Sequence, residues 1–206
     1  MTKITRNDPG KAVLTAVERG DHAKLKPLLK AGAPVTARNA QRATALLLAV
    51  RRRDAQAVKL LVQAGADVNA QDNIKDSPFL LAGALGDVEI LKLLIAAKPG
   101  PDFTRVNRYG GSALIPACER GHVDAVKLLI KAGVPVDHVN RLGWTGLIEA
   151  IILSDGGKPH QQIVKALIAA GADVDLADKD GVTPLQHAKA RGYTKIIALL
   201  EEAGAR

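Results

Sequence analysis

A period of about 33 residues runs along almost the whole chain and restricts its fold more than any other feature. One large apolar position recurs as Leu14, Leu46, Phe79, Leu114, Leu147 and Leu185. A glycine recurs in a second series with similar gaps, as Gly32, Gly65, Gly100, Gly133, Gly171 and Gly204. A unit this short cannot bury its apolar flanks alone, so successive units must stack against each other around a continuous core.

Each period contains two short apolar patterns with helical spacing. Val126, Leu129 and Ile130, for example, fall on one face of a helix. The joint between periods is clearest at residues 171–188, which read GADVDLADKDGVTPLQHA. Gly171 ends one helix, and Thr183 is a suitable N-cap for the next. The sequence therefore predicts pairs of helices separated by projecting turns.

Residues 171–188 and the two recurring series resemble the ankyrin-repeat family, whose repeated phrases are G-A-D-V-N, D-x-x-G and T-P-L-H-x-A. The resemblance implies an all-α solenoid of about six helix-turn-helix repeats with short β-hairpin or turn fingers. The resemblance extends over nearly the whole chain, and the chain is similar to small stand-alone bacterial ankyrin-repeat proteins. We expect a single domain over residues 1–206. The expected repeats are 9–38 as an N-terminal cap, 39–71, 72–106, 107–139, 140–177, and 178–206 as a C-terminal cap.

Two departures from the repeat pattern predict local differences. The turn glycine before the helix is replaced by Arg42 and Lys75 in two repeats. Because a side chain resists positive φ, we expect these turns to have altered tips. The segment Ser154–His160 inserts about five residues between two helices. We expect it to form a flexible loop, with a contact to a partner as one possible role.

Composition narrows the class of protein. No apolar run reaches membrane-spanning length, and the first residues, MTKITRNDPG, contain no signal-like apolar segment. We expect a cytoplasmic protein, with a periplasmic or secreted one as the alternative if a leader has been removed. The single cysteine, Cys118, excludes an intrachain disulfide and a cysteine metal cage, and a small buried hydrophobe is its expected role.

Motifs that would indicate catalysis or metal binding are missing from the sequence. It contains no nucleophile elbow, zincin helix, P-loop or dinucleotide fingerprint. The five histidines lack metal-ligand spacing on one helix, and the aspartates at 173, 175, 178 and 180 do not match a calcium loop. The loop Gly156-Gly157-Lys158 lacks P-loop spacing. We therefore expect no enzyme activity, no cofactor and no metal.

The resemblance also implies where a partner would bind. In the ankyrin family, the finger tips and first helices line a concave groove that grips other proteins. The matching positions here are rich in Arg, Tyr and Trp, the types that most often carry interface energy. The candidate partner-binding residues are Arg42, Arg51, Arg52, Lys75, Arg105, Arg108, Tyr109, His138, Arg141 and Trp144. For Tyr109 and Trp144, packing against the adjacent turn is an equally good interpretation.

The resemblance thus implies a non-enzymatic protein-binding module, with adaptor, inhibitor or immunity protein as its possible roles, and we expect it to be a monomer. The net charge of +8 favours a partner with an acidic patch. The alternative is binding to nucleic acid or an anionic surface through the same charge. This alternative is weaker, because the basic residues are spread over many repeats and aromatics make up only 2% of the chain, too few for a base-stacking platform.

Overall fold

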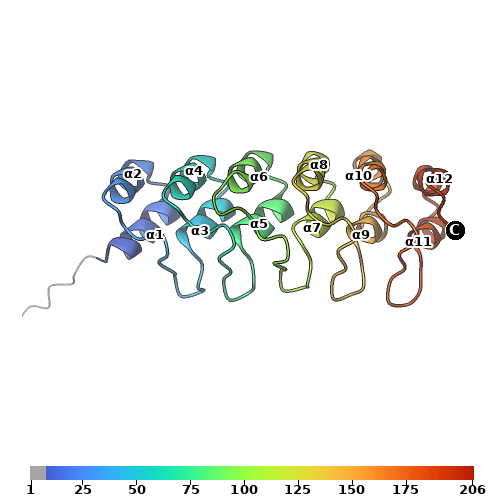
Figure 1. Cartoon of the computed structure of the whole chain (residues 1–206), viewed down its shortest axis with the longest axis horizontal. Helices are drawn as coiled ribbons and strands as arrows, with labels where there is room; N and C mark the ends of the chain where they lie inside the picture. Colours follow the sequence, from blue (N-terminus) through green and yellow to red (C-terminus); the bar gives the residue numbers. More distant parts are fainter. Residues whose placement is uncertain (1–7) are drawn as a thin grey trace, which may run out of the picture. The chain divides into compact units, whose positions relative to one another are not determined.

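The computed structural model describes residues 8–206, and these residues form consecutive pairs of α-helices (Figure 1). The pairs are α1 (Pro9–Arg19) with α2 (His22–Lys30), α3 (Ala45–Arg51) with α4 (Ala55–Gln63), α5 (Pro78–Leu85) with α6 (Val88–Ile95), α7 (Leu114–Glu119) with α8 (Val123–Lys131), α9 (Gly146–Ile152) with α10 (Lys158–Ala169), and α11 (Pro184–Arg191) with α12 (Thr194–Glu202). Over residues 8–206 the only β structure is one isolated antiparallel bridge between Arg38 and Thr44. The all-α prediction is confirmed, and the expected hairpin fingers are turns with almost no ladder.

The helices belong to two compact units. Unit 1 contains the chain up to Leu81 together with Glu89–Asp102, and unit 2 contains Ala82–Val88 and Phe103–Arg206. In unit 1, α1 packs on α3 while α2 packs on α4. In unit 2, α7, α9 and α11 form one row, and α8, α10 and α12 lie along it, with α10 in contact with both of its neighbours. Each unit is therefore a stack of helix pairs with first helices in one layer and second helices in the other.

Small and branched aliphatic side chains fill the space between the layers. The largest fully buried side chains are Leu25, Leu46, Leu47, Leu61, Ile90, Leu91, Leu94, Leu114, Leu129, Leu147, Ile148 and Ile151. Alanines that are almost completely buried, such as Ala49 and Ala117, allow neighbouring helices to approach closely. The recurring apolar position seen in the sequence is buried in every repeat.

Threonine and aspartate side chains begin several of the helices. The Thr183 hydroxyl accepts a hydrogen bond from the Gln186 backbone N–H, and the Gln186 side chain accepts one from the Thr183 N–H, which completes a capping box. The predicted N-cap at Thr183 is confirmed. Asp54 caps α4 in the same way through the N–H of Ala57.

Each helix pair after the first is preceded by a turn, and we call these five turns fingers one to five. They comprise residues 39–43, 72–76, 107–111, 140–144 and 178–182. Each begins with Asn or Asp at a base position: Asn39, Asp72, Asn107, Asn140 and Asp178. In every finger the base Oδ1 accepts hydrogen bonds from the backbone N–H groups two and four residues further on, at 2.9 to 3.1 Å. The side chain thus imitates a turn of backbone and fixes the shape of the finger.

The expectation of altered tips at Arg42 and Lys75 is wrong. Both residues adopt the left-handed conformation, with φ of 60° and 63°, as Gly110 does with φ of 79°. Their backbone N–H groups donate to the carbonyl of the base residue, as the glycine N–H does in the third finger. The repeated hydrogen bonds of the finger offset the strain of a side chain at positive φ, which is about 1–2 kcal/mol.

The inserted segment Ser154–His160 is held in place, contrary to the expected flexible loop. The Tyr193 hydroxyl donates to the Ser154 carbonyl at 2.6 Å, and Gln161 Nε2 donates to the Gly156 carbonyl at 2.7 Å. A Cβ added at Gly156 would lie 2.7 Å from the Tyr193 ring, so the loop backbone packs directly on that ring. The last residues of the segment form the first turn of α10.

Candidate protein-binding surface

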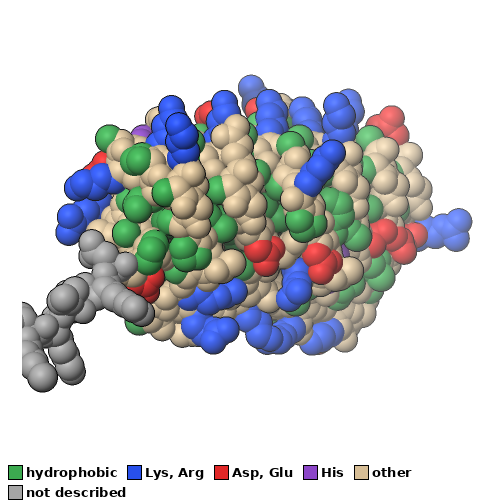
Figure 2. Space-filling model, turned by 60° about the vertical axis from the view of Figure 1, so that its left-hand side comes forward, with side chains coloured by type: hydrophobic (Ala, Val, Ile, Leu, Met, Phe, Trp, Pro, Cys, Tyr) green, Lys and Arg blue, Asp and Glu red, His purple; other side chains and the backbone are tan. Residues whose placement is uncertain are grey.

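The predicted partner-binding residues lie on the fingers, two residues before a finger (Arg105 and His138), and at the end of α3. Figure 2 shows many Lys and Arg side chains on the visible surface. The exposed members of the set are Arg42, Arg51, Arg52, Lys75, Arg105, Arg108, Tyr109 and Arg141, whereas His138 and Trp144 are half-buried. The structure divides them into side chains that point to solvent and side chains that join one repeat to the next.

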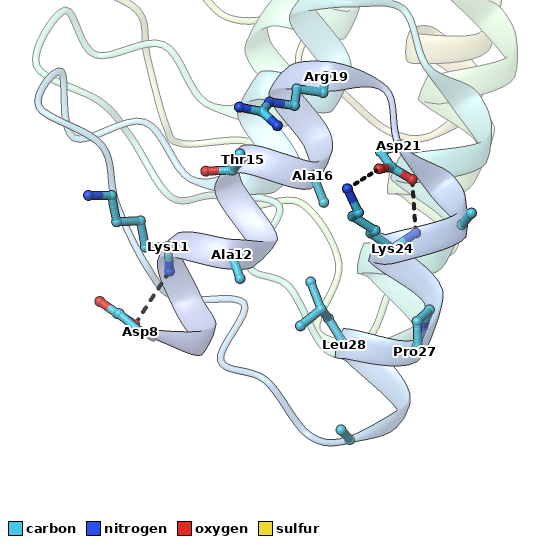
Figure 3. A pocket seen from close by; sticks show the side chains of 12 residues that line it. Asp8, Lys11, Ala12, Thr15, Ala16, Arg19, Asp21, Lys24, Pro27 and Leu28 are labelled. Carbon is cyan, nitrogen blue, oxygen red and sulfur yellow. Dashed lines mark hydrogen bonds and ion pairs between the residues drawn. The ribbon is translucent and has the colours of Figure 1, made fainter. Parts of the chain in front are cut away.

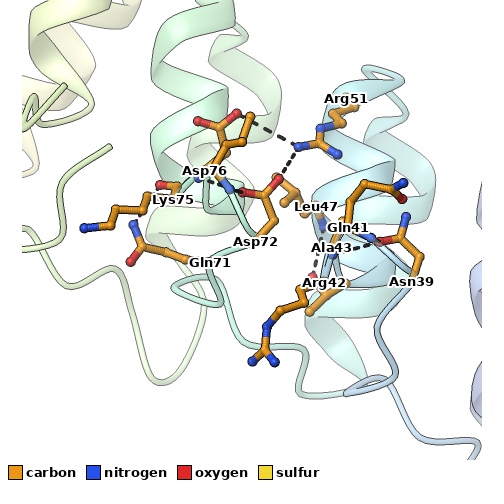
Figure 4. Close-up of polar contacts among 12 residues, drawn as sticks. Asn39, Gln41, Arg42, Ala43, Leu47, Arg51, Gln71, Asp72, Lys75 and Asp76 are labelled. Atoms are coloured by element: carbon orange, nitrogen blue, oxygen red, sulfur yellow. Dashed lines mark hydrogen bonds and ion pairs between the residues drawn. The ribbon is translucent and has the colours of Figure 1, made fainter. Parts of the chain in front are cut away.

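In unit 1, the two arginines at the C-terminal end of α3 have structural partners. Arg51 pairs with the carboxylate of Asp72, the base residue of the second finger, whose side chain is only 2% exposed. Arg52 donates to the Glu18 carbonyl at 3.0 Å. By contrast, the side chains of Arg42 and Lys75 point away from their fingers (Figure 4). The charges available to a partner in this set are therefore those of the two finger tips.

In unit 2, the third and fourth fingers are joined side by side. The backbone N–H of Arg141 donates to the Tyr109 carbonyl at 3.0 Å, and its guanidinium donates to the Arg108 carbonyl at 2.9 Å. His138 Nε2 lies 2.7 Å from the Gly110 carbonyl. Arg108 stacks on the Tyr109 ring with its guanidinium carbon 4.6 Å from the ring centre. These contacts fix a cationic, aromatic surface before any partner arrives.

The two aromatic candidates differ in exposure. Tyr109 has 58% of its surface exposed, although it carries the stacked guanidinium of Arg108. Trp144 is half-buried, and its backbone N–H is held by Asn140. Sequence reasoning missed Leu142, which is 52% exposed at the tip of the fourth finger. The sequence contained a signal for this exposed position, because Leu142 is two residues after its base residue, as Tyr109 is.

A buried carboxyl lies beneath the fourth finger. Glu149 on α9 is 6% exposed, and its Oε1 accepts a hydrogen bond from Asn140 Nδ2 at 2.7 Å. Burial, assisted by the Glu119 carboxylate, raises the pKa of Glu149 to about 7. The nearby Cys118 is completely buried, and that burial raises the pKa of its thiol far above the usual range. Neither group is accessible to a substrate, and a neutral thiol is a poor nucleophile.

Two of the other histidines pair with aspartates. His22 Nε2 lies 2.7 Å from an Asp54 carboxylate oxygen, and His187 Nε2 lies 2.8 Å from an Asp178 carboxylate oxygen. The pKa of Asp178 is lowered, first by the Val182 backbone N–H and then, after the opposing effect of burial, by His187. In residues 8–206, no three His, Cys, Asp or Glu side chains gather as a metal site would require.

A groove of about 890 Å³ lies between α1 and α2, and no residue of α3 or α4 lines it (Figure 3). Its floor includes Ala12, Ala16 and Leu28. Figure 2, with this end turned forward, shows hydrophobic side chains exposed beside Lys and Arg. By repeat position, Lys11 and Lys24 stand where the next repeat has alanines that are fully buried, Ala43 and Ala57. Charged replacements at these places are what an N-terminal capping repeat needs.

Comparison with known proteins agrees with this architecture. Family models for ankyrin repeats match residues 79–178, as three copies, and residues 41–73. An ankyrin repeat domain from Acinetobacter baumannii AYE superimposes with a TM-score of 0.91 at 52% identity, over 94% of this chain and 98% of that one. The ankyrin repeat domain of Bcl-3 superimposes with a TM-score of 0.84 at 28% identity, over 95% and 86% of the two chains.

A curated bacterial relative is also similar. The ankyrin repeat protein YahD of Escherichia coli (strain K12) is 49% identical over 106 residues, which are 51% of this chain and 53% of YahD. The matched region thus spans about half of YahD. None of the helices in residues 8–206 has the length and apolarity needed to cross a membrane. Ankyrin repeats generally mediate protein–protein interaction and are typically non-enzymatic. The period, the paired helices, the fingers and these likenesses place the chain in the ankyrin-repeat family.

Proposed function

We propose that the protein is a non-enzymatic interaction module that binds a partner protein through its finger tips and the adjoining first helices. The observation that carries the proposal is the joined pair of third and fourth fingers. There, Tyr109 is 58% exposed beside Arg108, and Arg141 is fixed by two hydrogen bonds to the neighbouring finger. Exposed Tyr and Arg side chains on a fixed backbone are the typical anchors of protein interfaces.

The fixed shape of the fingers bears directly on affinity. Side chains and loops that must be ordered on binding each reduce affinity, by about 0.5–1.5 kcal/mol for a flexible side chain. In each finger the base side chain already holds two backbone N–H groups. A partner therefore meets a surface whose backbone needs little further ordering, as suits an adaptor, an inhibitor or an immunity protein.

Charge supports a partner that presents an acidic patch. The chain has a net charge of +8, and the exposed cations of unit 2 include Arg105, Arg108 and Arg141 at or near its finger tips. Opposite charges accelerate encounter and make the association rate fall with added salt. We propose that the protein acts as a monomer in the cytoplasm, which light scattering and cell fractionation can check.

The test is affinity capture from native lysate, followed by a charge-reversed variant. Changing Arg105, Arg108 and Arg141 to Glu should weaken capture of the main partner by at least about tenfold. The matched control reverses Lys127, Lys131 and Lys165, which are exposed on α8 and α10 and change the net charge equally. Undiminished capture by the finger variant, or equal loss in the control, would remove the finger surface as the binding site. Recovery of nucleic acid in place of protein would favour the anionic-surface alternative.

A further inference from the structure

The residue two places after the base of each finger distinguishes the central fingers from the outer ones. From the first finger to the fifth it is Gln41, Ile74, Tyr109, Leu142 and Asp180. The three large apolar residues are 47%, 58% and 52% exposed. The position is thus polar in the first and last fingers and apolar in the three between.

The turn itself does not need an apolar side chain at this position. In the first finger the Gln41 N–H donates to the Asn39 side chain at 3.1 Å, and in the fifth the Asp180 N–H donates to the Asp178 side chain at 3.0 Å. Tyr109 makes the same bond in the third finger at 2.9 Å. Since Gln and Asp form the same turn, the fold gives no reason to expose Ile, Tyr or Leu. Exposed apolar groups that the fold does not require indicate a binding surface.

Each apolar tip has a cation next to it in the chain. Lys75 follows Ile74 in unit 1, and Arg108 and Arg141 precede Tyr109 and Leu142 in unit 2. The arginine pair is linked, because the guanidinium of Arg141 donates to the Arg108 carbonyl. In unit 2 the tips therefore present two apolar side chains within a cationic border.

The distance between the two tips sets the spacing of a ligand. The backbone N–H of Arg141 donates to the Tyr109 carbonyl at 3.0 Å, so the backbones of the third and fourth fingers are direct neighbours, and Leu142 is the next residue after Arg141. Hydrogen-bonded neighbouring backbones lie about 5 Å apart, and an extended peptide advances about 3.3 Å per residue with alternate side chains on opposite faces. Two residues of extended chain, roughly 7 Å, therefore reach from one tip to the next with both side chains on the same face.

We propose that the Tyr109–Leu142 pair binds an extended peptide segment with two large apolar residues two positions apart and carboxylates around them. This inference rests on the proposed function, and it specifies the chemistry of the partner at the finger surface. The apolar side chains contact Tyr109 and Leu142, and the carboxylates lie near Arg108 and Arg141. A guanidinium suits a carboxylate because it can donate two parallel hydrogen bonds.

The probe is a fluorescein-labelled peptide of about eight residues, with two leucines two positions apart among glutamates. A second peptide has the same composition with a leucine at each end, and a third has lysine in place of glutamate. We expect fluorescence anisotropy to show at least about tenfold tighter binding of the first peptide than of either other one. Equal affinity for the first two peptides would contradict the spacing, and binding of the lysine peptide would contradict the charge.

Variants locate the site. Tyr109→Gln and Leu142→Gln copy the residue that the first finger already uses, so the turn is retained, and together they should reduce peptide affinity at least about tenfold. The control is Leu153→Gln, which removes a leucine that is 48% exposed away from the fingers. Thermal melting checks that all variants fold. If the double variant still captures its lysate partner and the peptide at full strength, this inference fails while the wider proposed function stands. If no protein is captured by the natural chain, the proposed function itself fails.

Discussion

The buried carboxyl of Glu149 should make the protein less stable as the pH rises through neutrality. Its side chain is 6% exposed, lies near Glu119, and has a pKa raised from 4.5 to about 7. The folded chain therefore holds a proton at this site that the unfolded chain has already released. Stability falls with pH wherever the folded state binds more protons, which here is between about pH 4.5 and pH 7. Each pKa unit corresponds to about 1.4 kcal/mol, so the loss above pH 7 is at most about 3 kcal/mol.

Glu149→Gln should remove this loss. The glutamine carbonyl can accept the same hydrogen bond from Asn140 Nδ2, and it carries no charge to bury. We expect the variant to match the natural chain near pH 4.5 and to exceed its free energy of unfolding by up to about 3 kcal/mol at pH 8. For a chain of this length the difference corresponds to a rise in melting temperature of roughly 5–10 °C.

The assay is thermal and urea unfolding, followed by circular dichroism, at several pH values from 4.5 to 8. Comparing the variant with the natural chain cancels the carboxylates that both share, such as Asp54, whose pKa is lowered. Glu202→Gln is the control, since Glu202 is exposed on α12 and its removal should leave the pH profile unchanged. If the free energy of unfolding of the variant differs from that of the natural chain by the same amount at every pH in this range, the reasoning is refuted.

Two further substitutions test the local geometry. Lys75→Gly should stabilise the chain by about 1 kcal/mol, because glycine adopts the observed φ of 63° without strain. Urea unfolding measures the change, and a lower midpoint for the variant would show that the lysine side chain stabilises the fold by more than its backbone strain destabilises it. Tyr193→Phe should cost about 1 kcal/mol by removing the 2.6 Å hydrogen bond to the Ser154 carbonyl, and hydrogen exchange should rise in the 154–157 segment. Unchanged exchange there would mean that ring packing alone holds the loop.

The fold was predictable because stacking imposes a period on the sequence. The apolar series through Leu46 and Leu147 and the turn at Gly171 follow from burial and helix termination, which act locally and recur. The error at Arg42 came from treating one residue's φ in isolation. The base residue Asn39 holds the turn with its side chain, and that contact outweighs the preference of a single side chain.

The binding surface was only partly predictable, because the pattern of charges does not show which side chains are engaged. Arg51 has the same charge as Arg42, yet it pairs with the buried Asp72, whereas Arg42 extends from its finger. The exposed fraction of a side chain could not be predicted from the sequence either. Leu142 is an ordinary apolar residue in the sequence, and only the structure shows that it is exposed at the tip of a finger. Side-chain contacts between repeats depend on the relative positions of neighbouring repeats, which the repeat period of the sequence does not specify.

Hydroxyl-radical footprinting of the complex with the captured partner tests the central claim most directly. Tyr109 and Leu142 are 58% and 52% exposed in the free chain, and Leu153 is 48% exposed on a different part of unit 2. If the finger tips form the interface, Tyr109 and Leu142 should be strongly protected from oxidation in the complex while Leu153 reacts as before. Unchanged oxidation of Tyr109 and Leu142 in a saturated complex would contradict the account.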